Sequence, residues 1–213
     1  GLGDVYKRQV QDLLRQCPQR ERFAEQFAVQ LNDTHPTMAV PELIRILTSE
    51  GMDFEQAAEI AFRAFSFTNH TVMPEALECW SESLMRAVAP ELIPIIRRLD
   101  EHLRAQGHEG LCIVENHTIH MANLAIACTH CTNGVAELHT HILKERVFAD
   151  WHRAYPDRLQ NVTNGITPRR WLGVCNPELT ALLSDTLGGD DFLTDLARLG
   201  ALRRDPLPRK FSR

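Results

Sequence analysis

Three short apolar segments of this chain end in clusters of polar residues, and helix-forming sequence separates them. The polar clusters occupy residues 32–35, 68–71 and 163–165. The apolar runs that lead into them have the length of buried strands; they are predicted as strands at residues 27–31, 65–68 and 159–162. Strands separated by long helical segments, without hairpin signals, indicate a helix-rich α/β fold with a mostly parallel sheet.

Apolar residues at three- and four-residue spacing predict helices between these strands. One begins between Thr37 and Pro41 and ends near Gly51, and Asp53 is a candidate cap for the next. A third starts at Pro74 and continues through Leu84 and Val88. Further helices are predicted at residues 92–106, 135–142, 168–175, 177–187 and 193–199. Residues 107–120 and 121–128 have no clear period, and Asn164-Gly165 is predicted as a tight turn.

Composition excludes several classes of function. The net charge is 23 − 28 = −5 and is spread along the chain, with one cationic cluster at residues 203–210. A nucleic-acid groove is therefore not expected. No apolar run reaches the roughly 18 residues that span a bilayer, so no membrane association is expected. The six cysteines have irregular spacings, which favours reduced thiols in the cytoplasm.

The first nine residues fit no pattern that follows them. They resemble translated adapter sequence, and we predict that residues 1–9 are a non-native segment. The fold is therefore interpreted from residue 10 onward.

The polar clusters are candidate binding residues because ligands of parallel sheets bind beyond the carboxyl ends of the strands. Asn, Asp, His and Thr together offer the donors and acceptors that sugar hydroxyls need. Each cluster alone is equally well explained by helix caps and turns. Capping does not require an imidazole, however, and His35 and His70 occupy equivalent positions. This pair favours a site.

One sequence pattern resembles a metal site. Cys128 and Cys131 are separated by two residues, and His139 and His141 follow. A structural zinc site uses four ligands, and the chain has no second pair of this kind. We therefore expect buried free thiols rather than bound metal.

Five motifs, in this order and at these separations, resemble those of the glycogen, starch and maltodextrin phosphorylases. The resemblance covers about residues 11–200. The motifs are Gln-Leu-Asn-Asp-Thr-His-Pro at 30–36, Thr-Asn-His-Thr at 68–71 with Pro-Glu-Ala-Leu-Glu at 74–78, Met-Ala-Asn-Leu at 121–124, Asn-Gly-Val-Ala at 133–136, and Asn-Val-Thr-Asn-Gly-Ile-Thr-Pro-Arg-Arg-Trp at 161–171.

The resemblance implies part of a fold with two Rossmann-like domains that face each other across a cleft (the GT-B glycosyltransferase type). Residues 10–164 would end the N-terminal domain, and residues 165–213 would begin the C-terminal cofactor domain. The implied reaction is reversible phosphorolysis of terminal α-1,4-glucosidic bonds, in which inorganic phosphate releases glucose 1-phosphate with retention. The implied cofactor is pyridoxal 5′-phosphate, bound as a Schiff base. The implied parent is a cytoplasmic homodimer.

The resemblance also assigns roles to individual residues. His70 matches a histidine that holds the glucosyl unit in the catalytic subsite, and Asn164 matches the asparagine that shares the 6-hydroxyl with it. Trp171 matches an aromatic residue near the cofactor. The remaining implied substrate-binding residues are Asp33, His35, Asn69, Thr71, Asn133, Gly134 and Val135.

Several features depart from the family pattern. The chain contains only Lys7, Lys144 and Lys210, and none lies in the motif that anchors the cofactor. Cys128, Cys131 and His141 replace residues that the family usually has, without affecting an implied site residue. The isolated chain is thus expected to be inactive. A non-catalytic glucan-binding module is the alternative, and a small zinc-stapled domain is a third.

Overall fold

The computed structural model describes residues 2–108 and 110–203. The chain divides into two compact units, Gly1–Thr163 and Asn164–Arg213, and each is described by itself below. Gly1, the first residue of the predicted non-native segment, lies outside the described residues, as does the cationic cluster beyond Arg203.

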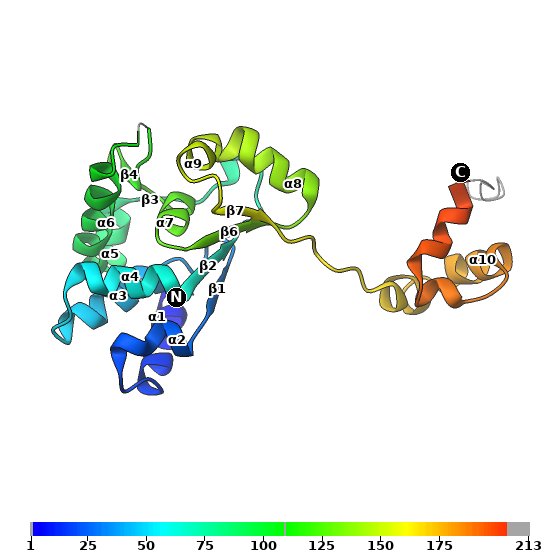
Figure 1. The fold of residues 1–213 in the computed structure, drawn as a ribbon, viewed down its shortest axis with the longest axis horizontal. Coiled ribbons are helices and arrows are strands. Elements are labelled where there is room, and N and C mark those ends of the chain that lie inside the picture. Colours follow the sequence, from blue (N-terminus) through cyan, green and yellow to red (C-terminus); the bar gives the residue numbers. More distant parts are fainter. Residues whose placement is uncertain (1, 109, 204–213) are drawn as a thin grey trace. The chain divides into compact units, whose positions relative to one another are not determined.

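A parallel sheet forms the centre of the first unit (Figure 1). Its strands are β1 (Val29–Asn32), β2 (Phe65–Thr68), β6 (Cys131–Gly134) and β7 (Leu159–Asn161). The order in the sheet is β1-β2-β6-β7, and all neighbours are parallel. The helix-rich α/β fold with a parallel sheet is thereby confirmed. Strand β6 was not predicted, because its four residues include Asn133 and Gly134, which are uncommon in strands.

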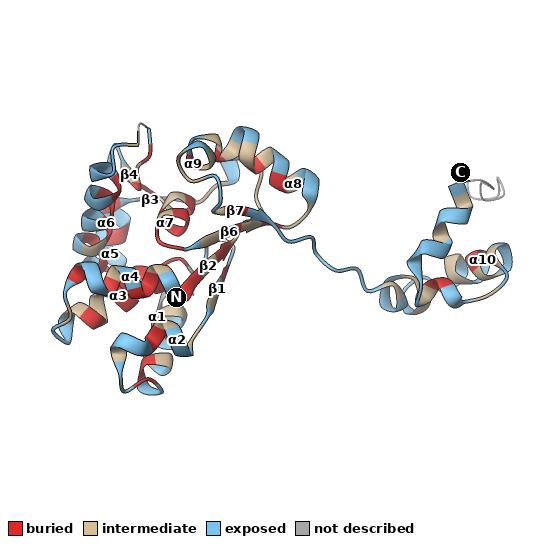
Figure 2. Cartoon of the chain, in the orientation of Figure 1, coloured by how far each residue is buried: buried red, intermediate tan, exposed pale blue. Residues whose placement is uncertain are grey.

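Helices surround the sheet, and buried side chains concentrate where the helices meet it (Figure 2). Figure 1 shows α1 to α4 gathered beside β1 and β2, with α8 and α9 beside β7. The largest fully buried side chains of the sheet are Leu31, Phe65 and Phe67. The helices are α1 (Leu2–Arg15), α2 (Phe23–Gln26), α3 (Ala39–Ser49), α4 (Phe54–Ala64), α7 (Met121–Ala127), α8 (Glu137–Ile142) and α9 (Ala149–Ala154).

The sequence signals at the ends of α3 and α4 act as predicted. Gly51 has φ = +99°, the left-handed conformation that ends a helix. Asp53 caps α4, since its carboxylate accepts a hydrogen bond from the backbone N–H of Glu55 at 3.0 Å. Helix α8 differs from its prediction, because Leu138 is 71% exposed and the buried face instead carries Thr140 and, in the π-helical turn Leu143–Val147, Leu143.

A second, antiparallel sheet corrects two predictions. Its strands are β3 (Cys79–Ser81), β4 (Val114–Glu115) and β5 (Thr118–His120), in the order β3-β5-β4. Strand β3 interrupts the helix predicted from Pro74, which is a 3-10 turn (Pro74–Ala76) followed by α5 (Glu82–Val88). The hairpin β4–β5 was also missed, because its turn residues Asn116 and His117, with φ of +48° and +60°, lack the usual glycine.

Helix α6 (Ile93–Ala105) follows the 3-10 turn Pro90–Leu92 and packs beside the antiparallel sheet. Asp100 joins the two, because its carboxylate accepts hydrogen bonds from the backbone N–H groups of Ile113 at 2.6 Å and Val114 at 3.1 Å. Arg104 pairs with the other oxygen of the same carboxylate at 2.7 Å. A buried acid with three donors is fully satisfied.

Helix α1 includes most of the segment predicted to be non-native. Tyr6 packs against the core, and Lys7 pairs with Glu91. Val10 and Leu14 are buried. The non-native origin of residues 1–9 stays a prediction.

The second unit contains a π-helical segment (Arg169–Val174), α10 (Pro177–Leu187), and two 3-10 helices, Asp191–Leu193 and Leu196–Arg203. Asn176 caps α10 through the N–H of Leu179 at 3.2 Å, and Gly188 ends it at φ = +78°, as predicted. Leu183 and Phe192 form its small buried centre. The tight turn predicted at Asn164-Gly165 is wrong, because residues 162–167 contain no turn.

None of the helices in the described residues combines the length and the apolar character that crossing a bilayer requires.

Candidate functional site

The carboxyl ends of all four parallel strands meet at one edge of the sheet. Asn32 is opposite Thr68, Thr68 is opposite Asn133, and Gly134 is opposite Asn161. The backbone ladder continues past the strands, because the N–H of Asp33 donates to Thr68 O at 2.8 Å and that of Asn69 donates to Asn133 O at 2.9 Å. The first residue of each loop is therefore fixed relative to its neighbour.

Side chains also connect neighbouring strands at this edge. The Gln30 amide donates to the Thr68 hydroxyl at 2.7 Å, and this hydroxyl donates to Asn133 Oδ1 at 2.8 Å. Asn133 Nδ2 donates in turn to the carbonyl of Gly134 at 2.9 Å. A hydroxyl that accepts one hydrogen bond and donates another has a fixed orientation. The network links β1, β2 and β6.

His70 extends from this edge into solvent and is held from one side. Its Nε2 lies 2.8 Å from Asn32 Oδ1. Because an amide oxygen only accepts, Nε2 carries the proton and Nδ1 is left for another partner. The residue before it, Asn69, is fully buried, and its Oδ1 accepts from the N–H of Thr71 at 3.0 Å. Asn69 Nδ2 has no partner within the described residues.

Asp33 and His35 occupy the loop after β1. Asp33 has φ = +65°, a left-handed conformation that Asp tolerates because its carboxylate bonds locally, here to the N–H of Thr34 at 2.9 Å. His35 Nδ1 lies 3.7 Å from Glu78 Oε2. The carboxylate of Glu78 also accepts from Thr34 Oγ1 and Trp80 Nε1, each at 2.8 Å. Local bonds thus explain the geometry of this loop.

Gly134 lies where β6 meets the first turn of α8. A Cβ at this position would be 2.9 Å from His139 Nδ1 and would also collide with the hydroxyl of Thr140. His139 Nδ1 accepts from the N–H of Val135 at 3.0 Å. Burial lowers the pKa of the His139 imidazole, and the proximity of the second imidazole, His70, lowers it further. His139 therefore favours its neutral form and adjoins the candidate site.

The structure brings seven of the predicted site residues to one edge of the first unit, and two others belong to the second unit. Asn164 and Trp171 belong to the second unit, and both are exposed there. Their place beside His70 stays a prediction. The residues together at the edge are Asp33, Asn69, His70, Thr71, Asn133, Gly134 and Val135, with His35 directed toward Glu78.

Three residues that hold this edge were given no individual role from the sequence, although Asn32 lies in the first polar cluster. Asn32 fixes His70, Asn161 accepts from Thr140 Oγ1 at 2.9 Å, and His139 accepts from Val135. Asn32 and Asn161 each end a strand, so the register of the sheet would have identified them. His139 follows Val135 by one helical turn, which was the available signal.

The cysteine pattern has no metal cluster around it in the part of the chain that the structure describes. Cys128 is buried, which raises the pKa of its thiol to about 12. A thiol in this state is protonated at neutral pH, whereas zinc binds the thiolate. All six cysteines, which lie within the described residues, are free.

The parallel sheet places this chain in the class of open α/β proteins, in which the carboxyl edge of the strands is the usual place for a ligand. The sequence also matches the model of the carbohydrate phosphorylase family over residues 5–212. This chain belongs to that family.

Curated relatives carry the same family name. The chain is 42% identical over 197 residues to the H isozyme of α-glucan phosphorylase from Triticum aestivum, covering 85% of this chain and 24% of that protein. It is 42% identical to the cytosolic α-glucan phosphorylase 2 of Arabidopsis thaliana (85% and 23% covered). It is 41% identical to the muscle form of human glycogen phosphorylase (85% and 23%). The chain thus spans about a quarter of the length of these relatives.

Proposed function

We propose that the protein containing this chain is an α-glucan phosphorylase, and that the chain supplies one wall of its sugar pocket. The reaction is phosphorolysis of a terminal α-1,4-glucosidic bond by inorganic phosphate, with release of glucose 1-phosphate. Family membership and the names of the relatives support the activity. The hydrogen-bonded edge around His70 is the observation that supports the location of the pocket.

His70 orients the glucosyl unit in this proposal. Its Nε2–H is engaged by Asn32, so the ring is fixed while Nδ1 and the backbone carbonyl are available to sugar hydroxyls. A preformed position avoids ordering the ring during the reaction. The carbonyl dipole next to the sugar also stabilises the positive charge that develops at the anomeric carbon. His70 is therefore assigned as a catalytic residue.

Other residues of the edge bind the hydroxyls of the sugar. Asn69 Nδ2 is buried without a partner in the described residues, and an unpaired buried donor favours an acceptor oxygen nearby. Thr71 and Asn133 add polar groups, and Gly134 permits close approach of the backbone. Asp33 and His35 line the adjoining loop and hold its shape. Asn164 of the second unit completes the contact with the 6-hydroxyl.

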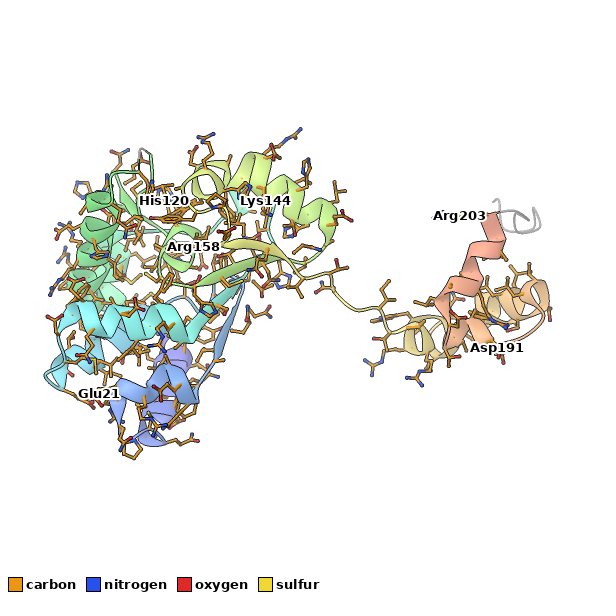
Figure 3. The ribbon with its side chains drawn as sticks, in the orientation of Figure 1. Glu21, His120, Lys144, Arg158, Asp191 and Arg203 are labelled. Carbon is orange, nitrogen blue, oxygen red and sulfur yellow. The ribbon has the colours of Figure 1, made fainter. Side chains whose placement is uncertain are left out.

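Pyridoxal 5′-phosphate is the cofactor that the resemblance implies, and when bound it would supply a phosphate group for proton exchange with the substrate phosphate. None of the described residues fits the role of the lysine that anchors this cofactor. A Schiff base requires a lysine, but Lys7 pairs with Glu91 on a distant helix and Lys144 lies in the helical turn after α8 (Figure 3). The anchoring lysine is therefore assigned to another part of the whole protein, and Trp171 remains the proposed cofactor contact of this chain.

The partners follow from the same proposal. An α-1,4-glucan and inorganic phosphate are the substrates, and neither a nucleic acid nor a membrane is required. We place the whole protein in the cytoplasm as a homodimer. The cytosolic name of the Arabidopsis relative supports the location.

Replacing His70 tests the proposed role. The whole protein with His70→Ala should lose about 10²-fold in kcat/KM for phosphorolysis of maltoheptaose, measured as glucose 1-phosphate released. His102→Ala is the matched control, because His102 is also exposed but lies on α6 beside Glu55. Equal activity of the two variants would contradict the role of His70.

Assays on the isolated 213-residue chain distinguish a phosphorylase from a glucan-binding module. Cleft ligands gain affinity from both walls, so the isolated chain should neither release glucose 1-phosphate nor bind maltoheptaose in isothermal titration. If the whole protein bound maltoheptaose but released no glucose 1-phosphate, the glucan-binding module would be favoured instead.

A further inference from the structure

A cavity of about 360 Å³ lies on the opposite edge of the parallel sheet. Its walls come from α4, α6, the end of α7 and the segment that leads into β7. Phe62, Cys128 and Arg158 shortly precede β2, β6 and β7, so the cavity adjoins the amino ends of these strands. The candidate sugar site is at their carboxyl ends. The cavity is therefore separate from it.

Arg158 is the cation of this cavity. Its guanidinium carbon lies 3.9 Å from the centre of the Tyr155 ring and 4.7 Å from that of Phe62. Figure 3 labels it at the start of β7. Within residues 2–108 and 110–203, its guanidinium makes no ion pair and no hydrogen bond to another residue. The guanidinium is thus held by aromatic contacts, and its five N–H donors have no protein acceptor in the described part of the chain.

The aromatic residues that hold Arg158 are themselves fixed. The Tyr155 hydroxyl donates to Gln106, and the Tyr155 ring stacks on Trp151 with centroids 6.2 Å apart. His108 meets the same ring edge-on at 4.9 Å. These contacts position the guanidinium before any ligand arrives, and preorganisation lowers the cost of binding.

Apolar and acidic residues complete the lining and define what fits. Ala58, Leu99 and Leu103 provide an apolar wall. Glu55 pairs with Arg98 at 3.3 Å and its carboxylate also lies 3.3 Å from His102 Nδ1, whereas Glu59 adds a negative charge to the rim. A doubly charged phosphate would be repelled by this rim. A single carboxylate matches the fork of one guanidinium, and a ring-sized apolar body matches the wall.

We propose that this cavity is a binding site for a small monocarboxylic acid with an aromatic or alicyclic body, whose carboxylate pairs with Arg158. The ring of the ligand packs against Leu99 and Leu103. The volume lies at the small end of the range for ligand pockets, which suits a single ring. The proposal does not depend on the activity of the family.

Phenylacetate is the probe for this site. Isothermal titration into the 213-residue chain and into the whole protein should show saturable binding of phenylacetate, with at least about tenfold weaker binding of neutral phenylacetamide and of phenyl phosphate. Arg158→Gln should weaken phenylacetate binding about 10- to 100-fold, and Arg158→Lys should fall between, since lysine keeps the charge but not the fork.

Arg153→Gln is the matched control, because Arg153 lies on the neighbouring helix α9, is exposed and pairs with Asp150. It should bind phenylacetate like the unchanged protein. Circular dichroism should show that each variant remains folded. Equal binding of the acid and its amide, or full binding by Arg158→Gln, would overturn the proposal. Binding by the isolated chain but not by the whole protein would show that another segment fills the cavity, and would also overturn it.

Discussion

Gly134 shows how a single residue sets the geometry of the sugar site. It ends β6, and the first turn of α8 packs directly against its backbone. The Thr140 hydroxyl on that turn lies 2.9 Å from both Ala136 O and Asn161 Oδ1, and these two acceptors share its single proton. It has no free rotation that would make room for a methyl group. Gly134 is thus required for space rather than for an unusual backbone conformation.

Gly134→Ala should destabilise the first unit by about 1–3 kcal/mol, the usual cost of overpacking. Urea unfolding followed by circular dichroism measures the change. Gly200→Ala is the control, because a Cβ there meets no atom within 4 Å. A Gly134→Ala protein as stable as this control would show that α8 moves away freely.

The residues of the candidate site differ in how far sequence predicts them. His70, Asn69 and Asn133 follow from motifs, since residue type and spacing are visible in the chain. The partners that fix them, such as Asn32 for His70, depend on which strands are neighbours and in which register. Neither property is encoded locally, so these contacts required the structure.

At the level of elements, one buried carboxylate joins three parts of the fold. Glu82 begins α5, and its oxygens accept from Arg97 Nε and Nη2 of α6, each at 2.8 Å. His117 Nδ1, in the β4–β5 turn, lies 3.1 Å from the same carboxylate. Hydrogen bonds from Arg97 and then His117 hold the pKa of Glu82 below its ordinary value of 4.5.

This depressed pKa makes stability depend on pH in a defined direction. The contribution of Glu82 is complete above the unfolded value near 4.5 and is lost as pH falls through the lower folded value. The free energy of unfolding should therefore decline below about pH 4.5, and Glu82→Gln should be less stable at pH 7 but decline less steeply. Urea titrations between about pH 3 and 7 measure both. Glu145→Gln changes an exposed residue and serves as the control; the free energy of unfolding of this variant should depend on pH as it does in the unchanged protein.

Helices were predicted more reliably than strands because their signals are local. Caps and periodic apolar residues identified α3, α4, α6 and α10. Strand β6 and the β4–β5 hairpin are short and gain stability from pairing with distant residues, which leaves little trace in composition. Leu84 and Val88 do lie on a helix, α5, but the predicted helix extended back to Pro74 across the residues that form β3.

For the whole molecule, the main feature is the division into two compact units. Residues 162–167 connect them, have no helix or strand, and are exposed. The domain boundary implied by the family resemblance, at Asn164–Gly165, stays a proposal. The segment carries Asn164, so the proposed sugar contact lies on the connection itself.

Thermolysin should cut the 213-residue chain first within this connection. The protease cleaves before apolar residues, and Val162 and Ile166 are 58% and 73% exposed. Exposed apolar residues within helices, such as Leu138, require local unfolding before cleavage. Mass spectrometry should identify products that end at residues 161 and 165, and Ile166→Asp should remove only the second. Earlier cleavage within α7 or β6 would contradict the assignment of the first unit as a stable body.

The order of the parallel strands has a consequence for synthesis of the protein. Because β1, β2, β6 and β7 occupy the sheet in the order in which they leave the ribosome, each new strand adds to the edge of the one made before it. Among these four described strands, none has to insert between two that are already paired. The nascent chain is thus able to add these four strands progressively, and their shared carboxyl edge around His70 is formed once β7 emerges.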